Sequence, residues 1–493
     1  MQRSAALVLL VIAGAPALAA QQRATATTGG PPPSAAALTA LVDSVVTANL
    51  LGRGVPSASV VVVRGDETLV QRAWGKADVA SGRAADASTV YAIGSNSKQF
   101  TAALLLRLVD RGRLTLGDSL GRHLSGIRPE WRAITIEQLL NHTSGLKRGD
   151  FVDMSRIEED VPFDSILPRI ARVDMAARPG AAHLYSNAGY VILGALVERL
   201  YGKPYAAALR DEIAQPLGLT TLRYCGDVEA GTGATGYQRS PADGTLSAPL
   251  ALHPSQQLGA SGICTTAADL AKWNRALHGG RVLSAASYEA MTTPRGVVTD
   301  YGLGLSLGRA SWGDPVVAHG GQEVSGFVSE NAWYPADSLS VTILYNVFPR
   351  VPSAGTNIVA ALALGHRPPA TRGQQPQPGI AGAAGTANPA APRAVAGTPA
   401  TGIVGEEARR QFVGEYQLGS RRIFRIEFEE GAFVLTPPGG EKTPMVHESG
   451  ATYAVGSRGS GTTVTFLADA EGRVVGFLAR AASAPDRTLP KIR

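Results

Sequence analysis

Cysteine, aromatic residues and metal-binding spacings are all scarce in this sequence of 493 residues, which contains two cysteines, eight histidines and 6% aromatic residues. The histidines show neither H-E-x-x-H nor another metal-ligand spacing, and two cysteines are too few for a zinc cluster. A Walker-type phosphate loop is also absent. These absences argue against zinc hydrolases and P-loop enzymes, and we expect no metal and no cofactor.

Neither basic nor acidic residues are in large excess. Lys and Arg number 46 and Asp and Glu number 40, so the net charge is +6, and it is spread along the chain. Without a cationic helix or arm, we expect no nucleic-acid partner. Apolar residues make up 44% of the sequence, which is enough for a globular core, and the length predicts more than one domain.

The amino terminus has the pattern of a signal peptide. Residues 1–20 combine one Arg, an apolar run from Ala5 to Ala13 and an ending of small residues at Ala17 and Ala19. The run is shorter than the roughly 20 residues that span a bilayer. We therefore expect an exported protein, periplasmic or secreted, with no transmembrane segment after signal cleavage.

Export bears on the two cysteines, Cys225 and Cys264. In an oxidising compartment two thiols can form a disulfide. The sequence does not give their separation in space, so two buried free thiols remain the alternative to the disulfide that we predict.

The composition changes along the chain in a way that predicts domain boundaries. Residues 21–35 predict a flexible tail, and residues 36–366 alternate between helical and extended patterns. Residues 367–408 are rich in Pro, Gly and Ala and predict a flexible linker. Residues 409–493 predict a small antiparallel β domain. Its expected strands are 412–418, 423–428, 432–437, 452–455, 462–467 and 474–478.

Ser95 and Lys98 form the first candidate for catalysis. They open a helical pattern, so their side chains lie one turn apart on the same face. A serine nucleophile needs a nearby base and donors for the developing oxyanion, which a helix amino terminus supplies. Ser144 and Lys147 have the same spacing, but the glycine between them breaks a helix, and we interpret this second match as a turn.

Tyr185 and Asn187 form a second candidate, just before an apolar, helix-like run. The Tyr185 hydroxyl can relay a proton between Ser95 and a leaving group, and Asn187 can hydrogen-bond substrate or Lys98. The alternative is a packed tyrosine followed by an asparagine that caps the next helix.

His319, Gly320 and Gly321 follow a strand-like run, where glycines allow substrate to approach the backbone. A second His-Gly-Gly begins at His278, but it ends a helical pattern, so we interpret it as a helix stop.

Taken in order, Ser95-x-x-Lys98, Tyr185-x-Asn187 and His319-x-Gly321 resemble the three active-site motifs of the serine β-lactamase and penicillin-binding-protein superfamily, in particular its class C, D-peptidase and esterase branch. Residues 139–146 and 262–270 are similar to further signature segments of that family. The resemblance covers residues 36–366. The carboxyl-terminal β domain is similar to the lipocalin-like domains that follow such enzymes.

The resemblance implies an α/β fold: an antiparallel sheet covered by helices beside a helical lobe, with the site between them. Ser95 would form an acyl-enzyme, Lys98 or Tyr185 would be the base, and Asn187 would orient substrate. The backbone N–H groups of Ser95 and Gln322 would form the oxyanion hole.

The third motif departs from the Lys-Thr-Gly of members that read a carboxylate. His319 replaces a permanent ammonium by a group that titrates near pH 6.5, so recognition of a carboxylate should weaken. We therefore expect a serine hydrolase of esters, amides or D-amino-acid peptides. A D-Ala-D-Ala peptidase, a true β-lactamase and a non-catalytic penicillin-binding or cell-wall receptor are the alternatives. The oligomeric state stays open.

Overall fold

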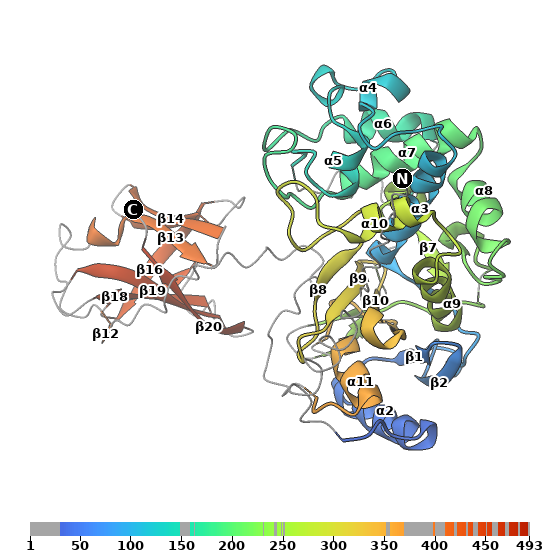
Figure 1. Ribbon diagram of the computed structural model, residues 1–493. Coiled ribbons are helices and arrows are strands. Elements are labelled where there is room, and N and C mark those ends of the chain that lie inside the picture. Colours follow the sequence, from blue (N-terminus) through green and yellow to red (C-terminus); the bar gives the residue numbers. More distant parts are fainter. Residues whose placement is uncertain are drawn as a thin grey trace, which may run out of the picture. The chain divides into compact units, whose positions relative to one another are not determined.

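The computed structural model describes most of the chain (Figure 1). The described ranges are 30–147, 158–161, 163–229, 231–240, 244–247, 249, 252–351, 355–368, 398–399, 410–418, 422–429, 432–436, 442–449, 451–455, 462–468, 473–481 and 484–491. The expected signal peptide, most of the expected tail and nearly all of the expected linker lie outside these residues. The described residues form two compact units, one on each side of residues 369–397.

The first unit is built on a six-stranded antiparallel sheet with the strand order β2-β1-β11-β10-β9-β8. Its strands are β1 (Ser57–Arg64), β2 (Glu67–Gly75), β8 (Ser306–Arg309), β9 (Pro315–Glu323), β10 (Phe327–Tyr334) and β11 (Leu339–Tyr345). β1 and β2 form a hairpin around Gly65 and Asp66.

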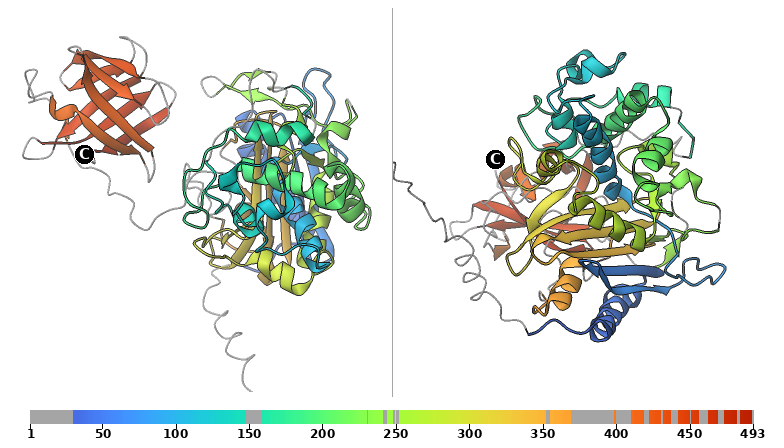
Figure 2. Two further views of the ribbon diagram at one scale, coloured as in Figure 1. Left: turned by 90° about the horizontal axis from the view of Figure 1, so that it is seen from above. Right: turned by 45° about the vertical axis from the view of Figure 1, so that its right-hand side comes forward.

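Helices cover both faces of this sheet because β1 is apolar on both sides. Val60 and Val62 pack with the helices α2 (Ala35–Asn49) and α11 (Gly355–Leu364), whereas Val61 and Val63 belong to the core that includes α9 (Ala267–His278). Successive side chains of a strand point to opposite faces, so a run of valines predicts a strand that is buried on both. The layered arrangement of sheet and helices is visible in both views of Figure 2.

Ten α-helices are described. They are α2 (Ala35–Asn49), α3 (Ser97–Asp110), α4 (Leu120–His123), α5 (Ile136–Leu140), α6 (Phe163–Ile170), α7 (Asn187–Tyr201), α8 (Tyr205–Leu209), α9 (Ala267–His278), α10 (Ala285–Thr292) and α11 (Gly355–Leu364).

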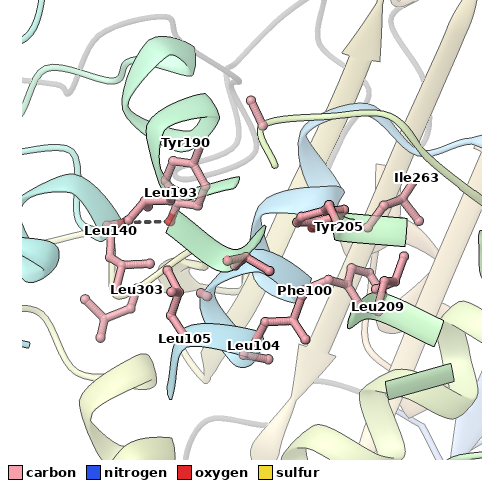
Figure 3. Close-up of a cluster of buried hydrophobic side chains, with 14 of the residues drawn as sticks. Phe100, Leu104, Leu105, Leu140, Tyr190, Leu193, Tyr205, Leu209, Ile263 and Leu303 are labelled. Atoms are coloured by element: carbon pink, nitrogen blue, oxygen red, sulfur yellow. Dashed lines mark hydrogen bonds between the residues drawn. The ribbon is translucent and has the colours of Figure 1, made fainter. Parts of the chain in front are cut away.

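Most of these helices form a lobe beside the sheet. Figure 3 shows its core, where leucines of α3 meet side chains of α7 and α8. The Tyr190 hydroxyl of α7 donates a hydrogen bond of 2.6 Å to the Leu140 carbonyl of α5. The sheet with its covering helices and this lobe confirm the expected fold class.

The first helix, α2, packs on the sheet through Leu38, Val42 and Val46. Leu41 is 41% exposed, because it lies outside this buried stripe. By length and composition alone, Ala35–Arg53 is apolar enough to cross a membrane. Its buried stripe is what a helix on the surface of a globular core requires.

Two small sheets complete the first unit. β7 (Ile263–Thr265) pairs with both β3 (Tyr91–Ala92) and β4 (Arg223–Tyr224), and β5 (Gln238–Arg239) pairs with β6 (Leu246–Ser247). β3 leads directly into the segment that carries Ser95. The three-stranded sheet therefore supports the start of α3.

The second unit is an antiparallel meander in which each strand pairs with the next. An isolated bridge between Tyr416 and Lys491 joins the first strand of the meander to the end of its last, so the sheet closes on itself. The short strand β12 (Thr398–Pro399) pairs with β18. The other strands are β13 (Gly414–Leu418), β14 (Arg422–Glu429), β15 (Ala432–Thr436), β16 (Thr443–Ser449), β17 (Thr452–Val455), β18 (Thr462–Ala468), β19 (Val474–Ala481) and β20 (Ala484–Pro490).

Aromatic side chains fill the core of the second unit. Phe412 and Phe466 stack with ring centroids 4.0 Å apart, and Phe433 and Tyr453 pack around them. All six strands that the sequence predicts are present, and the expected all-β architecture is confirmed.

Candidate active site

Ser95 lies in a one-turn 3-10 helix, η2 (Gly94–Asn96), that runs directly into α3. Between residues 91 and 106, Ser95 is the only residue that is not buried. A single reactive hydroxyl is therefore presented to solvent from an otherwise closed segment.

Hydrogen bonds on both sides of Ser95 fix this turn. The Asn96 amide donates to the Ser329 hydroxyl of β10 at 2.6 Å, and the Ser97 hydroxyl accepts from the Ile263 backbone N–H of β7 at 3.2 Å. The preceding Gly94 has φ of +54°, and a Cβ there would approach the Gln322 backbone nitrogen to 3.0 Å. Glycine is required because a side chain would both strain the backbone and press on β9.

Lys98 is buried with no exposed surface, and its amine makes three hydrogen bonds. Its Nζ lies 2.9 Å from Ser95 Oγ, 2.9 Å from Asn187 Oδ1 and 2.8 Å from the Ala260 carbonyl oxygen. The amide oxygen of Asn187 and the carbonyl of Ala260 can only accept. A charged amine would donate to all three oxygens. A neutral amine has two N–H groups and one lone pair, so in that form the two acceptors leave the lone pair for the Ser95 hydroxyl.

Burial favours this neutral form. Desolvation lowers the pKa of Lys98 well below its usual value, and the nearby Glu323 carboxylate opposes the shift. A lysine in this position can accept a proton from Ser95 at a pH where an exposed lysine is charged.

Tyr185 and Asn187 flank the start of α7, where Ser186 is the cap: its hydroxyl accepts from the Gly189 backbone N–H. Asn187 is thus the first helical residue and is free to face Lys98. Lys98 Nζ lies 4.9 Å from the centroid of the Tyr185 ring. The structure therefore brings the first two motifs together.

His319 lies inside β9, and it is buried at 2% exposure. Its Nδ1 donates to the Gly320 carbonyl at 2.7 Å, which leaves Nε2 to accept from the Tyr301 hydroxyl at 2.9 Å. Desolvation, helped by Lys98, lowers the pKa of His319 to about 3. The expectation of a group that titrates near pH 6.5 is therefore wrong, because a buried imidazole excludes the charged form.

Gly321 is required by close packing between β9 and the segment before Ser95. A Cβ at Gly321 would lie 2.0 Å from the Ile93 carbonyl oxygen. The glycines were expected at or just past the end of a strand, but β9 continues through them to Glu323. This contact places the Gln322 backbone beside the Ser95 turn, as an oxyanion hole of Ser95 and Gln322 would need.

Sequence reasoning assigned no role to several groups at this site. Tyr301 holds His319, and the Ala260 carbonyl holds Lys98. His142 stacks on Tyr185 with ring centroids 4.1 Å apart. His142 lies within one of the signature segments, which was the only available signal; the other two contacts depend on tertiary structure.

The second Ser-x-x-Lys, at Ser144, and the second His-Gly-Gly, at His278, are decoy motifs that lie outside the site. Gly145, within the second Ser-x-x-Lys, has φ of +79° and lies outside any helix, so Ser144 and Lys147 do not share a helical face. His278 is the last residue of α9, and Gly279 caps that helix. Both interpretations from the sequence are confirmed.

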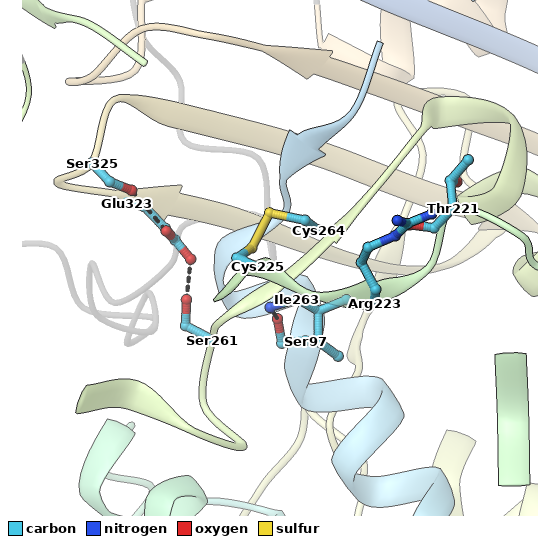
Figure 4. The surroundings of a disulfide bond; sticks show 9 residues. All are labelled: Ser97, Thr221, Arg223, Cys225, Ser261, Ile263, Cys264, Glu323 and Ser325. Carbon is cyan, nitrogen blue, oxygen red and sulfur yellow. Dashed lines mark hydrogen bonds between the residues drawn. A yellow bond between two sulfur atoms is a disulfide. The ribbon is translucent and has the colours of Figure 1, made fainter. Parts of the chain in front are cut away.

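The structure joins Cys225 to Cys264 in a disulfide, with Cα atoms 4.9 Å apart (Figure 4). The bond links the residue after β4 to the middle of β7. Within the described residues, no group of three His, Cys, Asp or Glu side chains gathers as a metal site would require.

A serine beside a buried lysine, at the start of a helix, is an arrangement that can activate a serine nucleophile. The chain belongs to the beta-lactamase family, whose family model matches residues 36–366. Both the fold and the order of the three motifs agree with this assignment.

Two proteins that are similar to this chain in sequence are named as different kinds of hydrolase. It is 37% identical over 210 residues to the esterase EstB of Burkholderia gladioli, which covers 39% of this chain and 53% of the esterase. It is 30% identical over 302 residues to a D-aminopeptidase of Brucella anthropi, covering 59% and 56% of the two chains. The chain thus spans little more than half the length of these relatives.

A solved structure resembles both units in fold. The octameric penicillin-binding protein homologue from Pyrococcus abyssi superposes with a TM-score of 0.59 at 20% identity, over 92% of this chain and 99% of the homologue. At this identity the likeness concerns the fold alone.

Proposed function

We propose that this serine hydrolase cleaves esters and amides, D-amino-acid peptides included, through an acyl-enzyme on Ser95. The observation that carries the proposal is the position of Lys98 Nζ, 2.9 Å from Ser95 Oγ and within hydrogen-bond distance of Asn187 and Ala260. When the amine is neutral, these two acceptors take its N–H groups and its lone pair is available to the Ser95 hydroxyl. This pattern favours Lys98 over Tyr185 as the base.

In the acylation step, Ser95 Oγ forms a bond to the substrate carbonyl carbon while its proton passes to Lys98 Nζ. The negative charge on the carbonyl oxygen is stabilised by the backbone N–H groups of Ser95 and Gln322. The proton then moves through the Tyr185 hydroxyl to the leaving oxygen or nitrogen, whose bond to carbon breaks. Water repeats the attack on the ester of Ser95 and releases the acid.

Two observations support esters and amides as substrates. An esterase and a D-aminopeptidase are among the relatives. The third motif offers a buried neutral imidazole, with both ring nitrogens hydrogen-bonded inside the protein, where carboxylate-reading members have an ammonium. A direct bond from His319 to substrate requires one of these contacts to open.

The experiment is to incubate the full chain with a chromogenic ester, a D-alanine anilide and a chromogenic β-lactam, and to record turnover and intact mass. We expect turnover of the ester and the anilide, with a transient mass increase equal to the acyl group. Ser95→Ala removes the nucleophile and should lower kcat by several orders of magnitude.

Ser144→Ala is the matched control, because Ser144 belongs to the decoy motif and should leave turnover within about twofold of the parent. Ser95→Ala activity within about tenfold of the parent would refute the assignment of Ser95. A stable adduct with the β-lactam and no turnover of any substrate would identify a receptor instead. Turnover of the β-lactam above the ester would identify a β-lactamase.

A further inference from the structure

A carboxylate stands at the site that the mechanism does not use. Glu323 follows Gln322 at the end of β9, and its Cγ would lie 3.2 Å from a Cβ on Gly94, the residue before Ser95. The side chain is partly exposed, in contrast to the buried Lys98. Glu323 therefore borders the space in which the acyl group of a substrate must lie.

Two serine hydroxyls hold this carboxylate in place. Ser261 donates to Oε1 and Ser325 donates to Oε2 at 2.8 Å (Figure 4). Ser261 directly follows Ala260, whose carbonyl binds Lys98. Both donors are hydroxyls, so neither contact brings a positive charge to the Glu323 carboxylate.

No cation of the described residues pairs with Glu323. The ion pairs of the described Lys, Arg and His side chains go to other carboxylates. Lys98 feels Glu323 through space, which opposes the lowering of its pKa, but its amine is hydrogen-bonded to Ser95, Asn187 and Ala260. Among the described residues, the carboxylate of Glu323 therefore has no ion-pair partner, and His319 adds no positive charge beside it.

We propose that Glu323 is a specificity-determining residue that binds an ammonium group of the substrate, so that the enzyme prefers esters and amides of acids with a free α-amino group. The proposal rests on the proposed hydrolysis at Ser95. An α-ammonium lies two bonds from the carbonyl carbon, so a substrate whose carbonyl oxygen contacts Gln322 carries its charge next to Glu323. A carboxylate at that position would be repelled.

Three methyl esters that differ in one α-substituent test the proposal: methyl propionate, D-alanine methyl ester and monomethyl methylmalonate, which carry hydrogen, an ammonium and a carboxylate. Acid release by the full chain is measured at pH 7, where the amine is protonated. We expect kcat/KM to fall in the order ammonium, hydrogen, carboxylate. Glu323→Gln should reduce the ratio of the ammonium ester to the neutral ester by about five- to tenfold, while Glu323→Asp should retain part of it.

Two controls separate charge from structure. Glu229→Gln removes the same charge from an exposed position of the same unit and should leave all three ratios unchanged. Ser261→Ala removes one hydroxyl contact and keeps the carboxylate, so it should preserve the order of the esters.

An equal loss for all three esters in Glu323→Gln would overturn the proposal, because it would make Glu323 a positioning residue for Ser261 and Ala260. An unchanged ratio would overturn it as well. Absence of turnover and of acylation at Ser95 with every ester would instead be a failure of the proposed function itself.

Discussion

The protonation state of Lys98 decides when Ser95 can react, because only the neutral amine has a lone pair for the serine proton. Burial lowers the pKa of this amine well below 10.5. The neutral form is lost as the pH falls through the lowered pKa. We therefore expect kcat/KM to rise with pH along a limb whose midpoint lies well below 10.5.

Lys98→Arg tests this assignment, since a guanidinium stays protonated throughout the accessible range. The variant should lose about 10²- to 10⁴-fold in kcat/KM at every pH, with its circular dichroism unchanged. Lys272→Arg, on the exposed side of α9, is the matched control and should keep the parent profile. Near-parental activity in Lys98→Arg would transfer the role of base to Tyr185.

Individual residues were predictable from the sequence only where a motif spans a few positions. Ser95, Lys98 and Asn187 could be found because helix geometry alone places the first two together and the third opens another helix. The Ala260 carbonyl could not, because 162 residues separate it from Lys98 in the sequence. Tyr301 could not, because its contact depends on the burial of His319 in β9. The charge state of His319 also required the structure, since it follows from burial.

At the scale of elements, the disulfide supports the three-stranded sheet β3-β7-β4, which precedes the turn that carries Ser95. Cys264 lies in β7, which pairs with β3, and β3 leads into η2. Its 39-residue separation from Cys225 gives a chain-entropy stabilisation of about 4 kcal/mol. An oxidising compartment, which export would provide, is the condition for this bond to persist.

Thiol counting and unfolding measure this contribution. Protein denatured without reductant should show no alkylatable thiol, and reduction should lower the free energy of unfolding of the first unit by up to about 4 kcal/mol. A Cys225→Ser/Cys264→Ser double variant should be insensitive to reductant. Two alkylatable thiols before reduction would contradict the pairing.

The strands of the second unit show where pattern reading succeeds. The predicted segment 452–455 has the observed bounds of β17, and the other five predicted strands agree within a few residues. β16 and β20 were missed because β16 carries Pro444 and several polar residues, and β20 carries Pro485 and Pro490. In a sequence pattern, a proline argues against a central strand, because it cannot donate a hydrogen bond to a neighbouring strand.

At the scale of the whole molecule, the two units have separate cores, and all candidate catalytic residues belong to the first. A chain that ends at His366 should therefore keep kcat/KM for simple esters within about threefold of the full chain. Calorimetry of the full chain should show two unfolding transitions, of which the shortened chain loses one. A single cooperative transition, or a loss of activity above tenfold, would mean that the second unit contributes to the site.

The pairing of β1 with β11 has a consequence for the synthesis of the protein. Ala58 pairs with Tyr345, and 345 − 58 = 287 residues separate them. At roughly 5–20 residues per second, a ribosome needs on the order of 15–60 s between these two positions. During that interval β1 has β2 on one side but lacks β11 on the other, and Ser95 lacks β9 until Glu323 has been made. The hairpin of β1 and β2 thus waits for its third strand, and the surroundings of Ser95 are completed only when the last strands of the sheet have been made.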